Sequence, residues 1–464
     1  MARSSTVPRL ARRFTALLFI PLLLLAMGLP ASAEGEMSVN AKSALLVCYN
    51  RDLVLYEQNA DERAYPASLT KIMTALLTFE AIDRGELSLD EMVSGSGNIW
   101  NGLSIYGSTQ NIKAGEEMCV EDLLYCMLVA SANEACNVLA ENISGSEEAF
   151  VALMNQRAAE LGCEDTHFAN AHGLHDDDHY TTARDLYRIT REAMKYPKFL
   201  EICSATDHTV PATNLSGERY FYTTNYLLSA KRIPGYTYSK AIGLKTGHTD
   251  EAGPCLIAAA KDGDTVMVSV VLDAPNVTQS DGTLLRQSFS ESKRLLEYGF
   301  SAFSERTVLK STDLLGEIPV SLSREATSVV YQPAEDLTAF LPSDLDLATL
   351  EKQVVLDAET VEAPVAEGQK LGTVTILRDG TPLASTDVVA VRAVSRSQLL
   401  YILARIRAVF SLLPVRLGLG VLAVLIVVLV VRRLLGGGGR GGRRGGRRRS
   451  APTVASGGYR GRKR

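Results

Sequence analysis

The chain has 464 residues, of which 46% are hydrophobic, and this length is sufficient for two or three domains with sizeable cores. Residues 1–33 hold four arginines and residues 432–464 hold twelve lysines or arginines, with no acidic residue in either stretch. The overall net charge of −5 therefore leaves −21 on residues 34–431, which argues against a main body that binds nucleic acid.

Residues 1–33 match a secretory signal peptide. The four arginines form a basic start, an apolar core runs from residue 14 to residue 29, and Ala31-Ser32-Ala33 follows as a cleavage pattern of small residues. An uncleaved anchor is the alternative. The apolar core is short and broken by Pro21, so we expect cleavage and export of the remaining chain.

Residues 38–300 predict a mixed α/β domain. The expected elements, in chain order, are a strand hairpin at 43–48 and 53–56, a helix at Ser68, a mainly helical stretch at 87–165 with loops at 94–97 and around Gly107, a helix at 182–195, a short strand at 241–248, a second hairpin at 255–260 and 265–272, and a closing helix at 284–298. Strands at both ends bracket the helices, so we expect one antiparallel sheet that both ends complete.

Residues 305–395 differ in character and predict a small all-β domain. Short runs of β-favouring residues recur there, separated by proline and glycine, and Asp379-Gly380 marks a tight hairpin. This stretch has no cluster of reactive side chains, so a spacer or a docking module is the expected role.

The C-terminal part predicts membrane attachment. Residues 398–413 have apolar side chains at helical spacing and suit the membrane interface. Residues 417–431 are uncharged and would extend roughly 22 Å as a helix, short of a ~30 Å hydrocarbon core, so the expected transmembrane helix is extended to 414–435. The cations that follow favour a cytoplasmic C-terminus and leave the preceding domains outside the cell.

The tail at 436–464 consists largely of glycine and arginine and is expected to be disordered. Its expected partners are the lipid bilayer and anionic lipids, and a nucleic-acid role is less favoured.

Ser68-Leu69-Thr70-Lys71 is the stretch most suggestive of chemistry. The apolar run after Ser68 predicts a helix, and a three-residue spacing places the serine hydroxyl and the lysine amine on one face. A neutral lysine so placed can accept the proton of a serine nucleophile. For this motif alone the competing interpretation, a helix-capping serine beside a solvated lysine, is favoured.

The loop at 166–182 is rich in histidine and aspartate and invites a metal-site interpretation. Metal sites need ligands that converge from a rigid frame, and a glycine-containing loop is more often a hydrogen-bonded turn, so we expect no metal. The seven cysteines cannot all pair within one chain and include no C-x-x-C motif. One disulfide within residues 119–136 remains an open alternative.

Three motifs stand in order along the chain: Ser68-Leu69-Thr70-Lys71, Ser131-Ala132-Asn133 and Lys245-Thr246-Gly247. This set is the signature of class A β-lactamases and penicillin-binding proteins. With the flanking residues Pro66–Thr74, Ser131–Ala135 and Lys245–Thr249, and with His172-Gly173-Leu174, the chain resembles the low-molecular-weight penicillin-binding proteins. These are serine-type D-alanyl-D-alanine carboxypeptidases of peptidase family S11, and the resemblance covers residues 38–395.

The resemblance implies a transpeptidase-type α/β domain at 38–300, an antiparallel sheet flanked by helices, followed by the small β domain. It implies that Ser68 attacks the penultimate D-alanine carbonyl of a peptidoglycan stem peptide and releases the terminal D-alanine. Lys71 would be the general base, and Ser131 would relay protons. β-Lactams would acylate the same serine as inhibitors, and no cofactor is needed.

Substrate binding is assigned by the same resemblance. Asn133 would hydrogen-bond the peptide, Lys245 would orient Ser131, and Thr246 would meet the terminal carboxylate. The backbone N–H groups of Ser68 and His248 would form the oxyanion hole. The remaining substrate-binding candidates are Gly247, which belongs to the third motif, and Arg286, the nearest candidate for the arginine that the family often uses to hold the carboxylate.

Two alternatives remain at this stage. A class A β-lactamase would share the fold and the motifs, but it needs a glutamate four residues before an asparagine ahead of the third motif, and residues 164–200 have no such pair. A non-catalytic, membrane-anchored wall-binding scaffold would have lost part of the motif set. All motif residues are present, which favours the enzyme.

Overall fold

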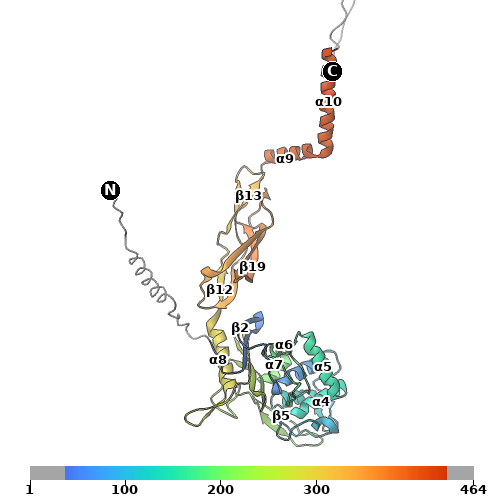
Figure 1. Cartoon of the computed structure of the whole chain (residues 1–464), viewed down its shortest axis with the longest axis vertical. Helices are drawn as coiled ribbons and strands as arrows, with labels where there is room; N and C mark the ends of the chain where they lie inside the picture. The colour runs from blue at the N-terminus through green and yellow to red at the C-terminus, as the bar shows by residue number, and fades with distance from the viewer. Residues whose placement is uncertain (1–36, 436–464) are drawn as a thin grey trace, which may run out of the picture. The chain divides into compact units, whose positions relative to one another are not determined.

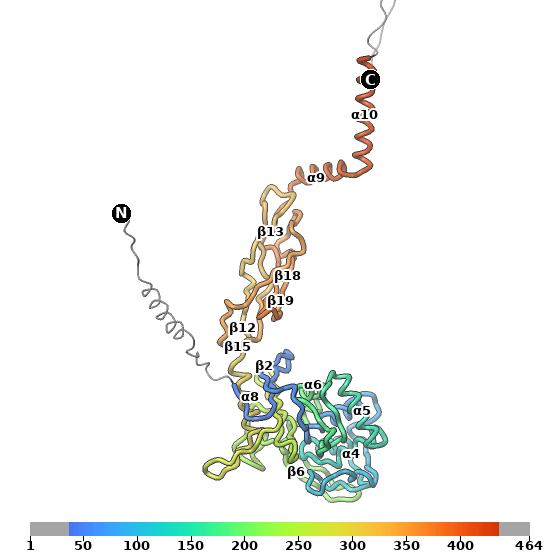
Figure 2. Tube along the Cα trace, in the orientation of Figure 1, coloured from blue at the N-terminus to red at the C-terminus, as the bar shows by residue number. Residues whose placement is uncertain are grey.

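The computed structural model describes residues 37–435 (Figures 1 and 2). The predictions for the signal peptide at 1–33 and the basic tail at 436–464 lie outside the described residues. The chain divides into two compact units. Unit 1 ends at Ser304 and also contains Phe340–Leu345, and unit 2 contains Glu305–Ala339 and the chain from Asp346 onward.

Unit 1 combines a central sheet with a group of helices on one face and the helix α8 (Gln287–Ala302) on the other. Its helices and strands are β1 (Ser43–Cys48), β2 (Leu53–Gln58), α2 (Lys71–Asp83), β3 (Met92–Val93), β4 (Met118–Cys119), α3 (Val120–Leu128), α4 (Asn133–Ser144), α5 (Glu147–Glu160), α6 (Ala183–Ala193), α7 (Pro197–Ser204), β5 (Asp207–Val210), β6 (Arg219–Tyr222), β7 (Ala241–Thr249), β8 (Gly253–Asp262), β9 (Thr265–Leu272), β10 (Val277–Thr278), β11 (Leu284–Leu285) and α8 (Gln287–Ala302). Short 3₁₀ turns are η1 (Tyr49–Arg51), η2 (Ala67–Thr70) and η3 (Gly97–Trp100).

The central sheet is antiparallel, with strand order β2-β1-β9-β8-β7. Strands from both ends of the unit therefore form one sheet, as predicted. Successive side chains of a strand point to opposite faces, so the buried residues of β1 divide between two cores. Leu46 packs in the core that contains Phe289, Leu295 and Leu296 of α8, whereas Leu45 packs in the core of the helical group.

Helices cover both faces of this sheet. Figure 2 shows α8 on one side of the strands and α4, α5 and α6 gathered on the other. The helix α8 packs on β8 and β9, and α6 packs on β9 and on α2. The helix α2 is buried along almost its whole length within the helical group. This burial fixes the turn that precedes α2, and that turn carries Ser68.

The expectation of helix over 87–165 is wrong for residues 87–119. Residues 87–119 form turns, η3 and the short strand pair β3–β4. Five glycines between Gly95 and Gly115 and many short polar side chains favour turns over a continuous helix there. The closing helix also begins later than expected, at Gln287, because Leu284 and Leu285 pair with β10.

Unit 2 is dominated by a six-stranded sheet of order β16-β18-β19-β14-β13-β17. The remaining elements of the chain are β12 (Phe303–Leu309), β13 (Gly316–Ser321), β14 (Ser328–Pro333), β15 (Leu337–Pro342), η4 (Leu347–Thr349), β16 (Glu351–Leu356), β17 (Val361–Glu362), β18 (Lys370–Arg378), β19 (Thr381–Ala390), α9 (Gln398–Ser411) and α10 (Leu413–Leu435). The predicted hairpin joins β18 to β19, and both Asp379 and Gly380 have positive φ, the backbone conformation that such a tight turn requires. The strand β15 was not predicted.

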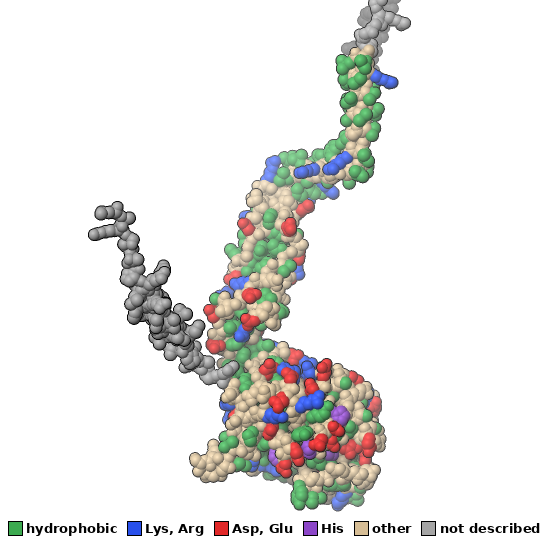
Figure 3. Space-filling view, in the orientation of Figure 1, with side chains coloured by type: hydrophobic (Ala, Val, Ile, Leu, Met, Phe, Trp, Pro, Cys, Tyr) green, Lys and Arg blue, Asp and Glu red, His purple; other side chains and the backbone are tan. Residues whose placement is uncertain are grey.

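The helix α10 is the one described helix that is long and apolar enough to cross a membrane. Figure 3 shows its surface as almost wholly apolar, and its leucine and valine side chains have no protein contacts that bury them. The preceding helix α9 exposes Leu399, Ile402 and Ile406 together with charged side chains, which is the amphipathic pattern expected of an interfacial helix.

Candidate active site

Ser68 lies in the 3₁₀ turn η2, directly before α2. Its hydroxyl oxygen is 2.8 Å from the Nζ atom of Lys71, the first residue of α2. The neighbouring Ala67 has a φ of 46°, a strained conformation for a residue with a side chain. Surrounding contacts therefore hold this turn in place, and the predicted pairing of serine and lysine is present.

Lys71 is completely buried. Besides Ser68, its Nζ atom contacts the side-chain oxygen of Asn133 and the backbone oxygen of His172, each at 2.7 Å. Burial lowers the pKa of Lys71 from its usual value to about 8. A neutral amine donates two hydrogen bonds, which Asn133 and His172 accept, and its lone pair is then left for the proton of Ser68.

A second serine–lysine pair lies in the same site. Ser131 occupies the break between α3 and α4, with a φ of 68°. The Nζ atom of Lys245, on β7, donates to the hydroxyl of Ser131 at 3.0 Å and to the backbone oxygen of Thr246 at 2.9 Å. Lys245 is also completely buried, and this burial, reinforced by the charge of Lys71, lowers its pKa to about 7.

Asn133 links the second motif to the first. It is the first residue of α4, its side-chain oxygen accepts from Lys71, and its backbone N–H donates to the backbone oxygen of Ser108 at 2.9 Å. The three motifs, which are far apart in the sequence, therefore meet through the side chains predicted for them.

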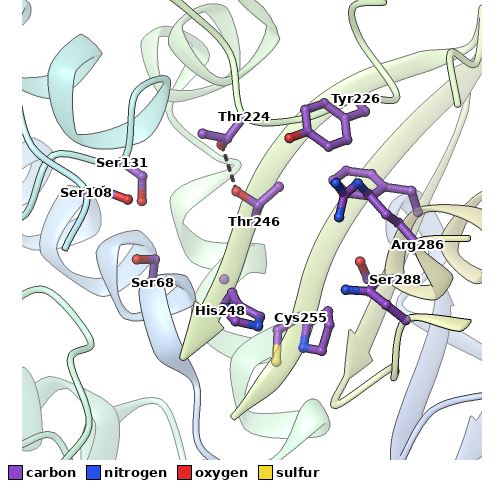
Figure 4. Close-up of a pocket in the computed structure, with 14 residues that line it drawn as sticks. Ser68, Ser108, Ser131, Thr224, Tyr226, Thr246, His248, Cys255, Arg286 and Ser288 are labelled. Atoms are coloured by element: carbon purple, nitrogen blue, oxygen red, sulfur yellow. Dashed lines mark hydrogen bonds between the residues drawn. The ribbon is translucent and has the colours of Figure 1, made fainter. Parts of the chain in front are cut away.

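A cavity of about 380 Å³ opens beside Ser68 (Figure 4). The predicted residues Ser131, Thr246, Gly247, His248 and Arg286 all contribute to its wall. Among the wall residues that sequence reasoning did not identify are four with hydroxyl groups, Ser108, Thr224, Tyr226 and Ser288. The position of Thr246 is fixed by a 2.7 Å hydrogen bond between its hydroxyl and that of Thr224, drawn as a dashed line in Figure 4.

Arg286 reaches this cavity because it stands just before α8 rather than within it. Its backbone is extended at the N-cap of that helix, and its guanidinium lies 5.9 Å from the ring centre of Tyr226. Figure 4 shows the arginine on the same side of the cavity as Tyr226, facing the strand that carries Thr246. The positive charge of Arg286 and the hydroxyl of Thr246 thus border the same cavity.

Gly247 serves a packing role. A side-chain carbon at this position would lie 3.1 Å from the backbone oxygen of Pro66 and 3.2 Å from a carbon of Leu69. The glycine therefore lets β7 approach the turn of Ser68 closely, and this approach brings the third motif beside the nucleophile.

The histidine-rich loop supports the same turn. The Nε2 atom of His179 is 2.8 Å from the hydroxyl of Thr70, and burial lowers the pKa of His179 to about 3, so the ring is neutral. Gly173, with a φ of 89°, packs directly on the backbone oxygen of Ala67. Within residues 37–435 no group of three His, Cys, Asp or Glu side chains is placed to hold a metal ion.

All seven cysteines are free, and six of them are buried. The disulfide that the sequence left open within residues 119–136 is absent. Burial raises the pKa of Cys136, which lies near the two lysines, to about 12, so its thiol stays protonated at neutral pH.

A serine hydroxyl in contact with a buried lysine, a second serine–lysine pair and a cavity bordered by a threonine and an arginine define an active-site serine enzyme of the acyl-transfer class. Comparison with known proteins agrees with this class. The D-alanyl-D-alanine carboxypeptidase family, peptidase S11, matches residues 30–276, and the C-terminal domain family of penicillin-binding protein 5 matches residues 303–396.

The similar proteins cover most of the chain. D-alanyl-D-alanine carboxypeptidase DacF of Bacillus subtilis is 31% identical over 82% of this chain and 94% of its own length. DacA of Escherichia coli is 29% identical over 78% of this chain and 85% of its own. The crystal structure of penicillin-binding protein 5 from Haemophilus influenzae aligns with a TM-score of 0.57 and 29% identity, covering 78% of this chain and 99% of that one.

The chain therefore belongs to peptidase family S11, the D-alanyl-D-alanine carboxypeptidases, and is a low-molecular-weight penicillin-binding protein. The family resemblance drawn from the three motifs is confirmed. The predicted fold is confirmed as well, since the α/β domain, the C-terminal β domain and one apolar C-terminal helix are all present.

Proposed function

We propose that this chain removes the terminal D-alanine from peptidoglycan stem peptides that end in D-Ala-D-Ala, through an ester on Ser68. The observation that carries the proposal is the 2.8 Å contact between the Ser68 hydroxyl and the buried amine of Lys71, whose lowered pKa leaves a substantial neutral fraction near pH 8. Family membership supplies the reaction type.

Acylation begins when Lys71 takes the proton of Ser68 as the serine oxygen bonds to the penultimate carbonyl carbon. The oxyanion that forms is held by the backbone N–H groups of Ser68 and His248, and each such donor contributes a few kcal/mol, about 100-fold or more in rate. The peptide C–N bond then breaks, and the leaving nitrogen receives a proton through Ser131. The 3.0 Å contact of Ser131 with Lys245 supports this relay role.

Two groups would bind the terminal carboxylate of the substrate. The Thr246 hydroxyl and the Arg286 guanidinium border the cavity beside Ser68, and charge-assisted hydrogen bonds to a carboxylate are stronger than neutral ones. Asn133 would hydrogen-bond the peptide on the other side of the serine. Water then hydrolyses the ester, releasing the shortened peptide and restoring the Ser68 hydroxyl.

The reaction is tested with purified full-length chain in detergent and a pentapeptide ending in D-Ala-D-Ala, with free D-alanine measured over time. Release by the native chain and none by Ser68→Ala is the expected result. Fluorescent penicillin provides the second arm, because a β-lactam acylates the same serine. Labelling of the native chain alone supports the enzyme, whereas no labelling of either protein would support a non-catalytic scaffold.

A β-lactamase is distinguished by the fate of this label. The carboxypeptidase assignment predicts a penicilloyl ester that persists long enough to be seen on a denaturing gel, whereas rapid turnover of excess penicillin would indicate a β-lactamase. The chain lacks the glutamate–asparagine pair between residues 164 and 200 that the class A enzymes use for fast deacylation.

We further propose a single-pass membrane protein with its catalytic domain on the extracellular face. The proposed segments are a signal peptide at 1–33, a catalytic domain at 38–300, a β domain at 305–395, an interfacial helix at 398–413, a transmembrane helix at 414–435 and a cytoplasmic basic tail at 436–464 that contacts anionic lipid. The apolar surface of α10 and the amphipathic surface of α9 support attachment to the bilayer.

Truncation tests the attachment. A chain that ends at Ser397 is expected in the soluble fraction, whereas the full chain should resist extraction by alkaline carbonate. Protease added to intact cells should degrade the catalytic domain and spare an epitope on the tail. Protection of the catalytic domain would contradict the proposed orientation.

A further inference from the structure

A second cavity meets the first at the nucleophile. Its volume is about 640 Å³, and it shares Ser68, Ser108 and His248 with the cavity that holds Thr246 and Arg286. From Ser68 it extends between the loop at 102–108, the residues Leu174 and His175, and the residues that follow β7. A bound substrate can therefore extend from Ser68 into both cavities. Its terminal carboxylate would occupy only the cavity with Thr246 and Arg286.

A buried donor faces this second cavity. The side chain of Asn133 is 4% exposed, its oxygen is taken by Lys71, and its NH₂ group has no hydrogen-bond partner within the described residues. A side-chain carbon on Gly107 would lie 2.7 Å from that nitrogen, so the glycine keeps the donor accessible. This nitrogen is open to the cavity, where a ligand oxygen can accept its hydrogen bond.

The direction of the substrate follows from the proposed function, on which this inference rests. With the leaving D-alanine beside Thr246, the part of the stem peptide that precedes the scissile bond must lie in the second cavity. The strand β7 is an edge strand of the central sheet, so an extended peptide can run beside it at about 3.3 Å per residue. The residue before D-Ala-D-Ala then lies near the end of β7, beside Asp250 and Glu251.

The wall of this cavity is acidic. It contains the carboxylates of Asp250 and Glu251, both exposed, and no lysine or arginine. A hydrogen bond from its own backbone N–H is the main cause of a lowered pKa at Glu251, so this carboxylate is charged at neutral pH.

A neighbouring cavity of about 470 Å³ shares Glu251 and adds three aspartates, Asp177, Asp178 and Asp273. Two cations border that neighbouring cavity, and both already have acidic partners. The amine of Lys42 is 3.2 Å from Glu62, and the guanidinium of Arg63 is 2.8 Å from Asp165.

We propose that Asp250 and Glu251 determine specificity by binding the free side-chain ammonium of a diamino acid that stands immediately before D-Ala-D-Ala. The NH₂ group of Asn133, which the proposed function already assigns to the peptide, would bind a carbonyl oxygen of the same peptide and fix its path through the cavity. The chain thus distinguishes stem peptides with a free amine from those in which the amine is already consumed in a cross-link.

The test compares three tripeptides that differ only at the side-chain amine of lysine. They are Nα-acetyl-Lys-D-Ala-D-Ala with a free amine, its Nε-acetyl derivative, which is neutral, and its Nε-succinyl derivative, which is anionic. The kcat/KM for D-alanine release is expected to fall in that order, by about 1.5- to fivefold between the first two, the range for an exposed charge pair. This preference should shrink when salt is raised to about 0.5 M.

The variant Asp250→Asn/Glu251→Gln is expected to reduce the ratio of kcat/KM for free over acetylated amine to about one. Asp264→Asn, a matched control in the exposed turn between β8 and β9, should retain the native ratio. Because the readout is a ratio, a change in the amount of folded enzyme does not affect it. The inference is overturned if the native chain has a kcat/KM ratio of one, or if the ratio is unchanged by the double substitution. In both cases D-alanine release would still support the proposed function. If no peptide releases D-alanine, the proposed function is overturned instead.

Discussion

The protonation state of Lys71 offers the sharpest test of the site. With a pKa of about 8, this lysine is about 1% neutral at pH 6, half neutral at pH 8 and about 90% neutral at pH 9. In the proposed function acylation of Ser68 needs the neutral amine, so the acylation rate should rise by about 90-fold from pH 6 to pH 9. Asn133→Asp would place a carboxylate where the amide oxygen now lies, 2.7 Å from the lysine amine.

That carboxylate favours the charged lysine and should raise its pKa by about 1–3 units. The pH midpoint of acylation should therefore move upward by the same amount, with a rate at pH 8 that is about 5-fold or more below the native rate. The assay is the second-order rate constant for labelling by fluorescent penicillin between pH 5.5 and pH 10, corrected for spontaneous hydrolysis of the drug.

Asn142→Asp on the same helix provides the control. This asparagine contacts the backbone oxygens of Ser94 and Val138, away from the lysines, and its substitution should leave the midpoint near pH 8. A flat native profile, or a midpoint that Asn133→Asp leaves unchanged or lowers, would refute Lys71 as the base. A native midpoint near pH 7 would assign the titration to Lys245.

Two further predictions concern the walls of the site. Gly173→Ala would place a carbon 1.9 Å from the backbone oxygen of Ala67, so penicillin labelling should fall by about 100-fold or more and the melting temperature should drop. The control is Gly145→Ala, which also has a positive φ but has open space around it. It should lower the free energy of unfolding by only about 1 kcal/mol and keep penicillin labelling. Arg286→Gln should raise KM for peptides ending in D-Ala-D-Ala by about 10-fold without affecting a C-terminal amide analogue. The control Lys293→Gln, within the helix α8 that Arg286 precedes, should leave both KM values unchanged. Equal losses in the glycine pair, or an unchanged KM in the arginine variant, would contradict these assignments.

The parts of the site that could be predicted are those with a local signal. The pairing of Ser68 with Lys71 follows from a three-residue spacing at a helix start, and that geometry is found in the structure. The break between two helices at Ser131 also has a local signal, because the helical periodicity of residues 122–139 stops at Ser131-Ala132-Asn133 and then resumes. The antiparallel sheet followed from two hairpins at opposite ends of the domain.

The remaining parts depend on contacts that leave no local pattern. The backbone oxygen of His172 accepts from Lys71 across 101 residues, and any residue type could supply that oxygen. Thr224 fixes Thr246 from a segment without regular structure. The cavity position of Arg286 depends on where α8 begins, and the pairing of β10 with β11, rather than helix propensity, decides that start.

The presence of two buried lysines explains how the proposed reaction moves a proton onward. Lys71 is neutral before it acts and becomes an ammonium once it takes the proton of Ser68. That ammonium lies in a site that burial already makes unfavourable for charge, with a second buried lysine contacting Ser131. Burial therefore raises the free energy of the Lys71 ammonium, so the proton moves readily to the leaving nitrogen through the Ser131 hydroxyl. On this account Lys245 acts through its hydrogen bond to the Ser131 hydroxyl, and a substitute at position 245 that cannot donate this bond would slow leaving-group departure even with Ser68 and Lys71 in place.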